Sequence, residues 1–202
     1  MKSFSEIDTT VKRAVRAGGF PWGIAEEVGK NIKLLEMFGL PGVKNINAYL
    51  KIYKKNIFEK IDKFEKSNKS KKYFCPIISG TNFMDQSTII QELKELEIKN
   101  MSFPVLLLPF LSRSSEIVGK RIFLKLDNKE FLLNFNQSIY SNYLSGEVVE
   151  IAEHIDIKFL DNKDTFSEEE WKNLYALSEN TFVEETDNLK NTAAGAGLTD
   201  ND

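Results

Sequence analysis

The sequence predicts an α+β protein, in which an N-terminal three-helix unit precedes a small mixed or antiparallel sheet with packed helices. Residues 4–64 repeat apolar side chains at three- and four-residue steps, as amphipathic helices do. Residues 73–182 combine short alternating apolar segments with fewer helical ones, a pattern typical of a sheet covered by helices. Residues 183–202 form an acidic, small-residue C-terminal tail. We expect the three parts to belong to one integrated domain.

Three helices are expected in the first unit. Ser3 and Glu6 have the spacing of a capping box at the start of the first helix. Pro21 suits the first turn of the second helix. The third is expected over residues 43–64. The apolar stripes that predict these helices are Ile7, Val11 and Val15, then Ile24, Val28, Ile32, Leu35 and Phe38, and finally Ile46, Leu50, Tyr53, Ile57 and Ile61.

The first half of the second unit is predicted from four segments. Residues 65–72 are rich in Lys, Ser and Asn and indicate an exposed linker. Residues 73–78 are expected to form a short strand, and residues 85–100 a helix. The apolar run 104–109 is bracketed by prolines, and we expect it to be the central strand, buried on both faces.

The second half of this unit alternates more clearly. Residues 111–118 indicate one or two helical turns, and residues 121–135 a hairpin with its turn at 127–129. Residues 148–159 predict one or two further strands. Ser167 then begins a capping box that starts the last helix.

Composition excludes several classes of function. The net charge is −3, with 27 basic and 30 acidic residues, which argues against a nucleic-acid-binding protein. One Cys and one His cannot form a disulfide within the chain or a Cys/His zinc site, so no metal site is assigned, although carboxylates alone can hold a metal. We find no signal-peptide core and no membrane span, and we expect a soluble, cytoplasmic bacterial protein.

Two residues are candidates for catalysis. Glu26 follows Trp22 by four residues, so a carboxylate lies beside an aromatic ring that can raise its pKa for acid–base work. The alternative is an acidic helix N-terminus beside a core Trp. Cys75 is a candidate nucleophile if His154 serves as its base, and a buried, inert cysteine otherwise. His154 itself lies on the polar face of a predicted strand, where solvation is the alternative.

Three further residues are candidates for ligand binding. Arg113 follows the presumed central strand, and with Ser112 it has the chemistry to bind a carboxylate or phosphate. The alternative is an ordinary surface helix. Asp200 and Asp202 place carboxylates at the chain end, where they suit docking into a cleft or holding a divalent metal; the alternative is a solvated tail.

Five segments together resemble a known family. They are Phe4–Asp8, Lys12–Gly29, Cys75–Ile77, Leu106–Leu111 and Gly195–Asp202, and they are similar to a proteobacterial family catalogued only as a domain of unknown function (number 3726). The resemblance implies no activity and no catalytic residue. Because it reaches the last residues, it favours a docking role for the tail.

Two functions fit these patterns. The first is a small-molecule enzyme or binder, with a cleft between the helical and sheet units that the C-terminal tail closes. The alternative is a non-catalytic accessory subunit that docks on a partner enzyme through its tail and helical unit. The sequence assigns no substrate, cofactor or oligomeric state.

Overall fold

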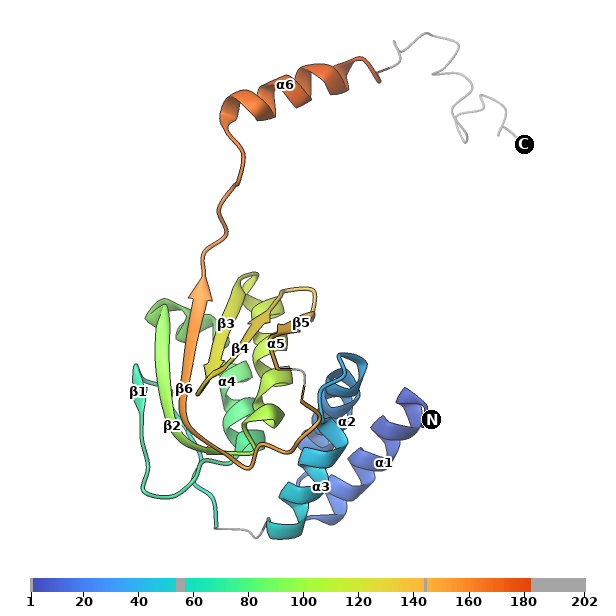
Figure 1. Cartoon of the computed structure of the whole chain (residues 1–202), viewed down its shortest axis with the longest axis vertical. Coiled ribbons are helices and arrows are strands. Elements are labelled where there is room, and N and C mark those ends of the chain that lie inside the picture. Colours follow the sequence, from blue (N-terminus) through green and yellow to red (C-terminus); the bar gives the residue numbers. More distant parts are fainter. Residues whose placement is uncertain (1, 54–56, 144, 183–202) are drawn as a thin grey trace, which may run out of the picture. The chain divides into compact units, whose positions relative to one another are not determined.

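The computed structural model describes residues 2–53, 57–143 and 145–182 (Figure 1). The chain divides into two compact units, Met1–Asn162 and Lys163–Asp202. The first holds three N-terminal helices, then a mixed six-stranded sheet with further helices. The predicted α+β class is therefore confirmed.

The three N-terminal helices are α1 (Phe4–Ala17), α2 (Trp22–Met37) and α3 (Gly42–Ile52). The predicted cap of α1 is present, because the Glu6 N–H donates to the Ser3 hydroxyl at 3.1 Å. The third helix is shorter than predicted. Ile61 has helical spacing in the sequence and is buried, but it lies in a non-helical segment that also bridges Glu59 to Phe74.

The sheet has the order β1-β2-β6-β3-β4-β5, and only β1 runs parallel to its neighbour. The predicted hairpin and last strand are confirmed as β3, β4 and β6. The predicted linker was wrong in part, because the Asn68 amide donates to the Glu97 carbonyl at 3.1 Å and joins its segment to the sheet. The strands are β1 (Ser67–Asn68), β2 (Glu95–Ser102), β3 (Arg121–Leu126), β4 (Lys129–Leu133), β5 (Ile139–Ser141) and β6 (Ile151–Leu160).

The predicted central strand at residues 104–109 was wrong. This run forms the 3-10 helix η2 (Pro104–Leu107) and the start of α5 (Leu108–Val118). Both prolines lie in first helical turns, where a missing N–H costs nothing. A short apolar run buried on all sides has no periodicity that separates strand from helix.

Two neighbouring predictions also shifted. The segment 73–78, predicted as a strand, contributes Cys75 as the N-cap of α4 (Pro76–Ile90). The predicted helix 85–100 is divided, because α4 is followed by the 3-10 helix η1 (Gln91–Leu93) and then by β2. Lys94 adopts φ 62° at this boundary, and that left-handed conformation breaks the helix.

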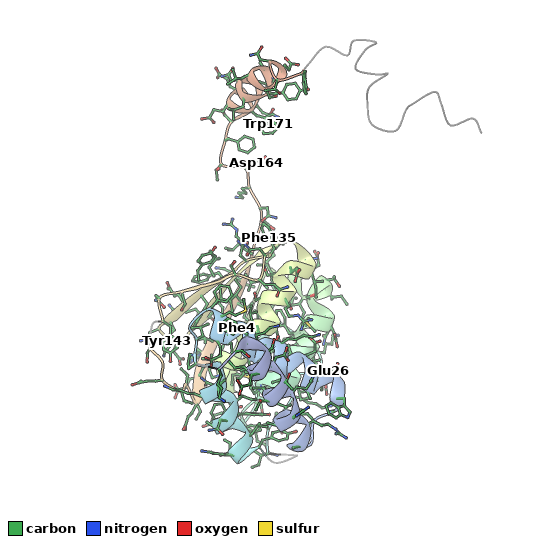
Figure 2. All side chains as sticks on the ribbon, turned by 90° about the vertical axis from the view of Figure 1, so that its right-hand side faces the viewer. Phe4, Glu26, Phe135, Tyr143, Asp164 and Trp171 are labelled. Atoms are coloured by element: carbon green, nitrogen blue, oxygen red, sulfur yellow. The ribbon has the colours of Figure 1, made fainter. Side chains whose placement is uncertain are left out.

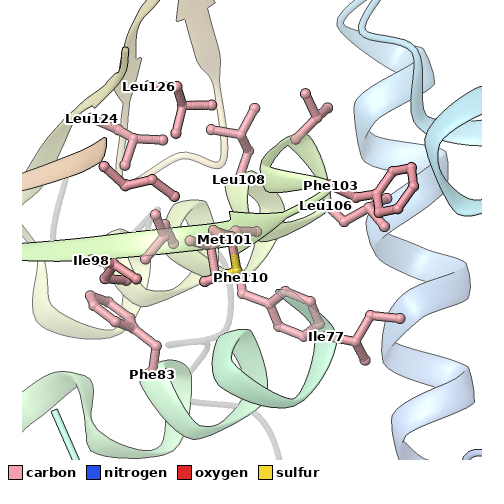
Figure 3. Close-up of a cluster of buried hydrophobic side chains, with 14 of the residues drawn as sticks. Ile77, Phe83, Ile98, Met101, Phe103, Leu106, Leu108, Phe110, Leu124 and Leu126 are labelled. Atoms are coloured by element: carbon pink, nitrogen blue, oxygen red, sulfur yellow. The ribbon is translucent and has the colours of Figure 1, made fainter. Parts of the chain in front are cut away.

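Helices α4 and α5 pack against one face of the sheet, and α2 contacts both of them (Figure 1). The core between these layers is drawn in Figure 3. It joins Phe83 of α4 and Phe110 of α5 to Ile98 of β2 and Leu124 of β3, all of which are buried. One hydrophobic core thus connects the helical part to the sheet.

The second unit contains α6 (Glu168–Glu179). Its predicted capping box is confirmed, because Ser167 and Glu170 each bind the other's backbone N–H, at 3.2 and 2.7 Å. Within the described part of this unit, none of the α6 side chains is buried.

The contact between α4 and α5 depends on Gly80. A Cβ added at Gly80 would lie 2.4 Å from Phe110 Cδ2, and two further ring carbons lie within 3.0 Å. Phe110 is itself 1% exposed, so its ring is enclosed by the core. Any side chain at position 80 must therefore separate the two helices.

We predict that Gly80→Ala lowers the free energy of unfolding by about 1–3 kcal/mol, the usual cost of overpacking a core. Gly23→Ala is the matched control, because a Cβ there meets nothing within 4 Å. That variant should change stability by less than about 1 kcal/mol, toward stabilisation. Urea unfolding measures both, and equal stability of the two variants would contradict this packing.

Candidate functional site

Trp22 and Glu26 both lie on the exposed surface of α2. Trp22 is 54% exposed, and the Arg16 guanidinium lies over its ring at 5.6 Å from the centroid. Glu26 is exposed as well, and Figure 2 shows it on the helical part of the first unit. Trp22 is therefore not the core residue of the alternative interpretation. The ligand-binding and catalytic roles of these residues stay predictions.

Arg113 lies in the middle of α5 rather than beyond a strand. Its guanidinium forms an ion pair with the carboxylate of Glu27, the neighbour of the residue chosen from the sequence. Lys30 Nζ also contacts Glu27, at 3.0 Å. Burial lowers the pKa of Arg113, an effect that Glu116 opposes, but a guanidinium stays charged at neutral pH. An anionic ligand at Arg113 would have to compete with Glu27.

Two buried polar side chains belong to the same two helices as this ion pair, and we call Glu27, Asn31, Ser112 and Arg113 the α2–α5 cluster. Asn31 follows Glu27 by one helical turn, and neither of its amide atoms has a hydrogen-bond partner among the described residues. The hydroxyl of Ser112, next to Arg113, also lacks one there. Buried polar atoms of this kind usually bind water or a ligand.

Cys75 is 3% exposed and has a structural position at the start of α4. Its Sγ accepts the Ile78 N–H at 3.4 Å and lies 3.0 Å from the Tyr49 hydroxyl, with which it forms a hydrogen bond. Burial raises the pKa of the Cys75 thiol, and burial together with Cys75 raises the pKa of Tyr49. A thiol in this state is a poor nucleophile. Its catalytic role stays a prediction.

His154 is exposed on β6, and its Nδ1 contacts Glu97 Oε1 at 3.2 Å rather than Cys75. Lys99, also 3.1 Å from Glu97, is the main cause of the lowered pKa of that carboxyl. Asp200 and Asp202 lie outside the described residues. Among the described residues, the structure thus brings Arg113 to Glu27 and Cys75 to Tyr49.

In residues 2–53, 57–143 and 145–182, no group of three or more His, Cys, Asp or Glu side chains is placed to hold a metal ion. Over the same ranges, none of the helices has both the length and the apolar character needed to cross a bilayer.

An apolar groove lies along α1, with a volume of about 820 Å³. We call it the N-terminal groove. Its apolar lining comes from Phe4, Ile7 and Val11 of α1 and from Val43 of α3. Phe4 is 48% and Val43 41% exposed, whereas Val11 is buried at the base. Figure 2 labels Phe4 on this part of the molecule.

The charged residues around the N-terminal groove, and Ser3, have partners within the chain. Lys2 Nζ and Glu6 Oε1 are 2.7 Å apart, and the Ser3 hydroxyl caps α1. Glu36 Oε1 accepts the Val43 N–H at 2.8 Å. The groove is therefore an apolar surface whose rim charges are largely engaged.

Sequence reasoning missed this groove, although part of the signal was present. Phe4, Ile7 and Val11 follow the i, i+3, i+7 spacing of one helix face. The sequence predicted a helix from Ile7, Val11 and Val15 and offered the helical unit as a docking surface, but periodicity does not say which end of a stripe stays uncovered. Nothing in the sequence indicates that Val43 lies beside Phe4.

Residues 2–75 match the family model described as a protein of unknown function (DUF3726). The resemblance predicted from the sequence is confirmed over these residues. They include α1, α2 and α3 with the whole N-terminal groove, and they end at Cys75. Neither a curated protein nor a solved structure matches the chain.

We predict a pH dependence of stability that comes from Cys75. Its pKa is higher in the folded than in the unfolded chain, so its contribution is complete below the unfolded value of about 8.5 and is lost as pH rises above it. Relative to Cys75→Ser, the free energy of unfolding should fall by up to about 1.4 kcal/mol per pH unit above 8.5. Parallel urea-unfolding profiles from pH 7 to 10 would contradict a buried thiol.

Proposed function

We propose that the protein is a non-catalytic interaction module, whose N-terminal groove binds an amphipathic helix of a partner protein. The observation that carries this proposal is the apolar lining formed by the exposed side chains of Phe4 and Val43 and the partly buried Ile7. Surface apolar patches of this kind commonly mark interaction sites. The N-terminal groove is a defined surface through which an accessory subunit could dock on its partner.

The chemistry of the groove favours a protein over a small molecule. Small-molecule sites combine an apolar wall with a few polar groups that fix the ligand's orientation. Here Lys2 pairs with Glu6, and the Glu36 carboxylate holds the Val43 N–H. An apolar ridge on a partner protein can bind through complementary shape and buried apolar area alone, without free polar groups in the groove.

The groove also favours a helix over an extended peptide. An extended peptide satisfies its backbone N–H and C=O groups by pairing with a strand edge. The groove lies between helices, whose backbone groups are bound internally except at their ends. A bound helix satisfies its own backbone and presents side chains at i, i+3, i+4 and i+7.

The proposal is tested by selecting, from a peptide library displayed on phage, the peptides that bind the immobilised full chain. We predict that enriched peptides carry apolar residues at helical spacing and bind Phe4→Glu or Val43→Glu at least about tenfold more weakly, because apolar burial is lost. Both positions lie in first helical turns, where a new carboxylate suits the helix dipole and preserves the fold.

Ile89→Glu is the control, because Ile89 is 74% exposed on α4 and does not line the groove. Selected peptides should bind this variant as they bind the unmodified chain. Enriched peptides that lack helical spacing, or that bind Phe4→Glu normally, would remove the groove as the binding site.

A second candidate is the small-molecule enzyme or binder, with a cleft between the helical and sheet parts. The α2–α5 cluster favours it, because Arg113 offers a cation and Asn31 and Ser112 have unused polar atoms. Trp22 and Glu26 would lie on its exposed side. Closure by the tail concerns residues outside the described ranges.

Thermal unfolding with succinate or inorganic phosphate separates the two candidates. Under the second, either anion raises the Tm of the full chain, Arg113→Met abolishes that rise, and Lys51→Met, on the exposed surface of α3, retains it. Under the interaction module we expect no Tm rise that depends on Arg113.

A further inference from the structure

Helix α6 is organised by its own N-terminus. The Ser167 hydroxyl accepts the Glu170 N–H, and Glu170 Oε2 in turn accepts the Ser167 N–H. The bond from the Ser167 N–H, with a second from the Ser167 hydroxyl to the same oxygen, lowers the pKa of the Glu170 carboxyl. Phe166, just before the cap, stacks on Trp171 with ring centroids 5.5 Å apart. Contacts between residues 166 and 171 therefore fix the position at which the helix begins.

The body of α6 is amphipathic. Trp171, Leu174 and Tyr175 follow the i, i+3, i+4 spacing of one face, and Leu177 lies beside Leu174 on its flank. Within the described part of its own unit, none of these side chains is buried. A helix of 12 residues is marginal in water without tertiary packing. Among residues 163–182, nothing thus buries the apolar face to stabilise the helix.

The charges of α6 indicate what covers this face. Glu168, Glu169 and Glu170 form the first turn, and Lys172 is the one cation in the helix. Helices that lie on membranes carry Lys and Arg beside the apolar face, because anionic lipids repel acidic ones. The same acidic turn is complementary to a protein surface with basic side chains.

Area argues against pairing of α6 with the α6 of a second copy of the chain. A helix of 12 residues is about 18 Å long. Two such helices in side-by-side contact bury far less than the ~800 Å² per partner of a stable interface. A groove contacts the flanks of a helix as well as its face, so it buries more area from the same segment.

We propose that α6 is a docking helix, which inserts Trp171, Leu174 and Tyr175 into an apolar groove, rimmed by Lys or Arg, on a partner protein. Phe166 extends the inserted face. The acidic first turn meets the basic rim and fixes the direction of the helix. This proposal does not depend on the N-terminal groove, which is a separate surface of the first unit.

Photo-crosslinking with the full chain in cells of its source organism tests the proposal. A benzophenone amino acid replaces either Tyr175, on the apolar face, or Ala176, on the opposite side of the helix. We expect the Tyr175 position to crosslink to one protein, at a peptide that carries apolar residues with Lys or Arg beside them. The Ala176 position should give at least about tenfold less product.

Two variants separate the apolar from the charge contribution. Leu174→Glu should lower the crosslink yield at position 175 at least about tenfold, because the inserted face is broken. Glu168→Lys with Glu169→Lys leaves the Ser167–Glu170 cap intact and should lower the yield several-fold by reversing charge at the rim. Neither should change the unfolding of the unit Met1–Asn162.

Several results would overturn the proposal. They are equal products from positions 175 and 176, a crosslink to phospholipid, a crosslink to the same chain or a second copy, and no product at all. A Leu174→Glu variant that crosslinks normally would also overturn it. Failure here would leave the peptide-binding test of the N-terminal groove unaffected.

Discussion

The close contact between Gly80 and the Phe110 ring holds the architecture of the first unit together. It allows α4 and α5 to form one layer, because a Cβ at position 80 would lie only 2.4 Å from Phe110 Cδ2. This layer packs on the sheet on one side and contacts α2 on the other. Both α4 and α5 must therefore be apolar on more than one side. The N-terminal helices depend on this layer, because α2 meets the sheet part through it.

The same constraint explains how the N-terminal groove arises. Helix α2 uses its buried residues against α1, α3 and the α4–α5 layer. The apolar stripe of α1 begins at Phe4, beyond the part of the stripe that α2 covers, so its first turns stay accessible. Because α2 packs on the later turns of α1, the apolar side chains at the start of α1 remain accessible. The proposed partner helix would complete that packing.

The sequence predicted elements whose signals are local. The capping residues Ser3 and Ser167 correctly predicted the starts of their helices. The alternation of apolar residues on either side of residues 127–129 correctly predicted the hairpin. The sequence-based predictions failed where tertiary packing determines the secondary structure. The run 104–109 is buried on all sides, so its period carried no information, and the strand predicted there became helical. The position assigned to Arg113 was wrong for the same reason. Choosing Glu27 over Glu26 requires knowing which side of α2 faces α5.

The central claim is that the N-terminal groove binds a helix, and methyl NMR of the full chain tests it most directly. The chain would be labelled at Ile and Val methyl groups and titrated with a helical peptide selected on it. If the N-terminal groove binds the peptide, we expect saturable chemical-shift changes at the methyl groups of Ile7, Val11 and Val43. The methyl signals of Ile89 and Ile117 should stay unchanged. Shifts centred on Ile89 or Ile117, or none at the groove methyl groups while the peptide binds, would contradict it.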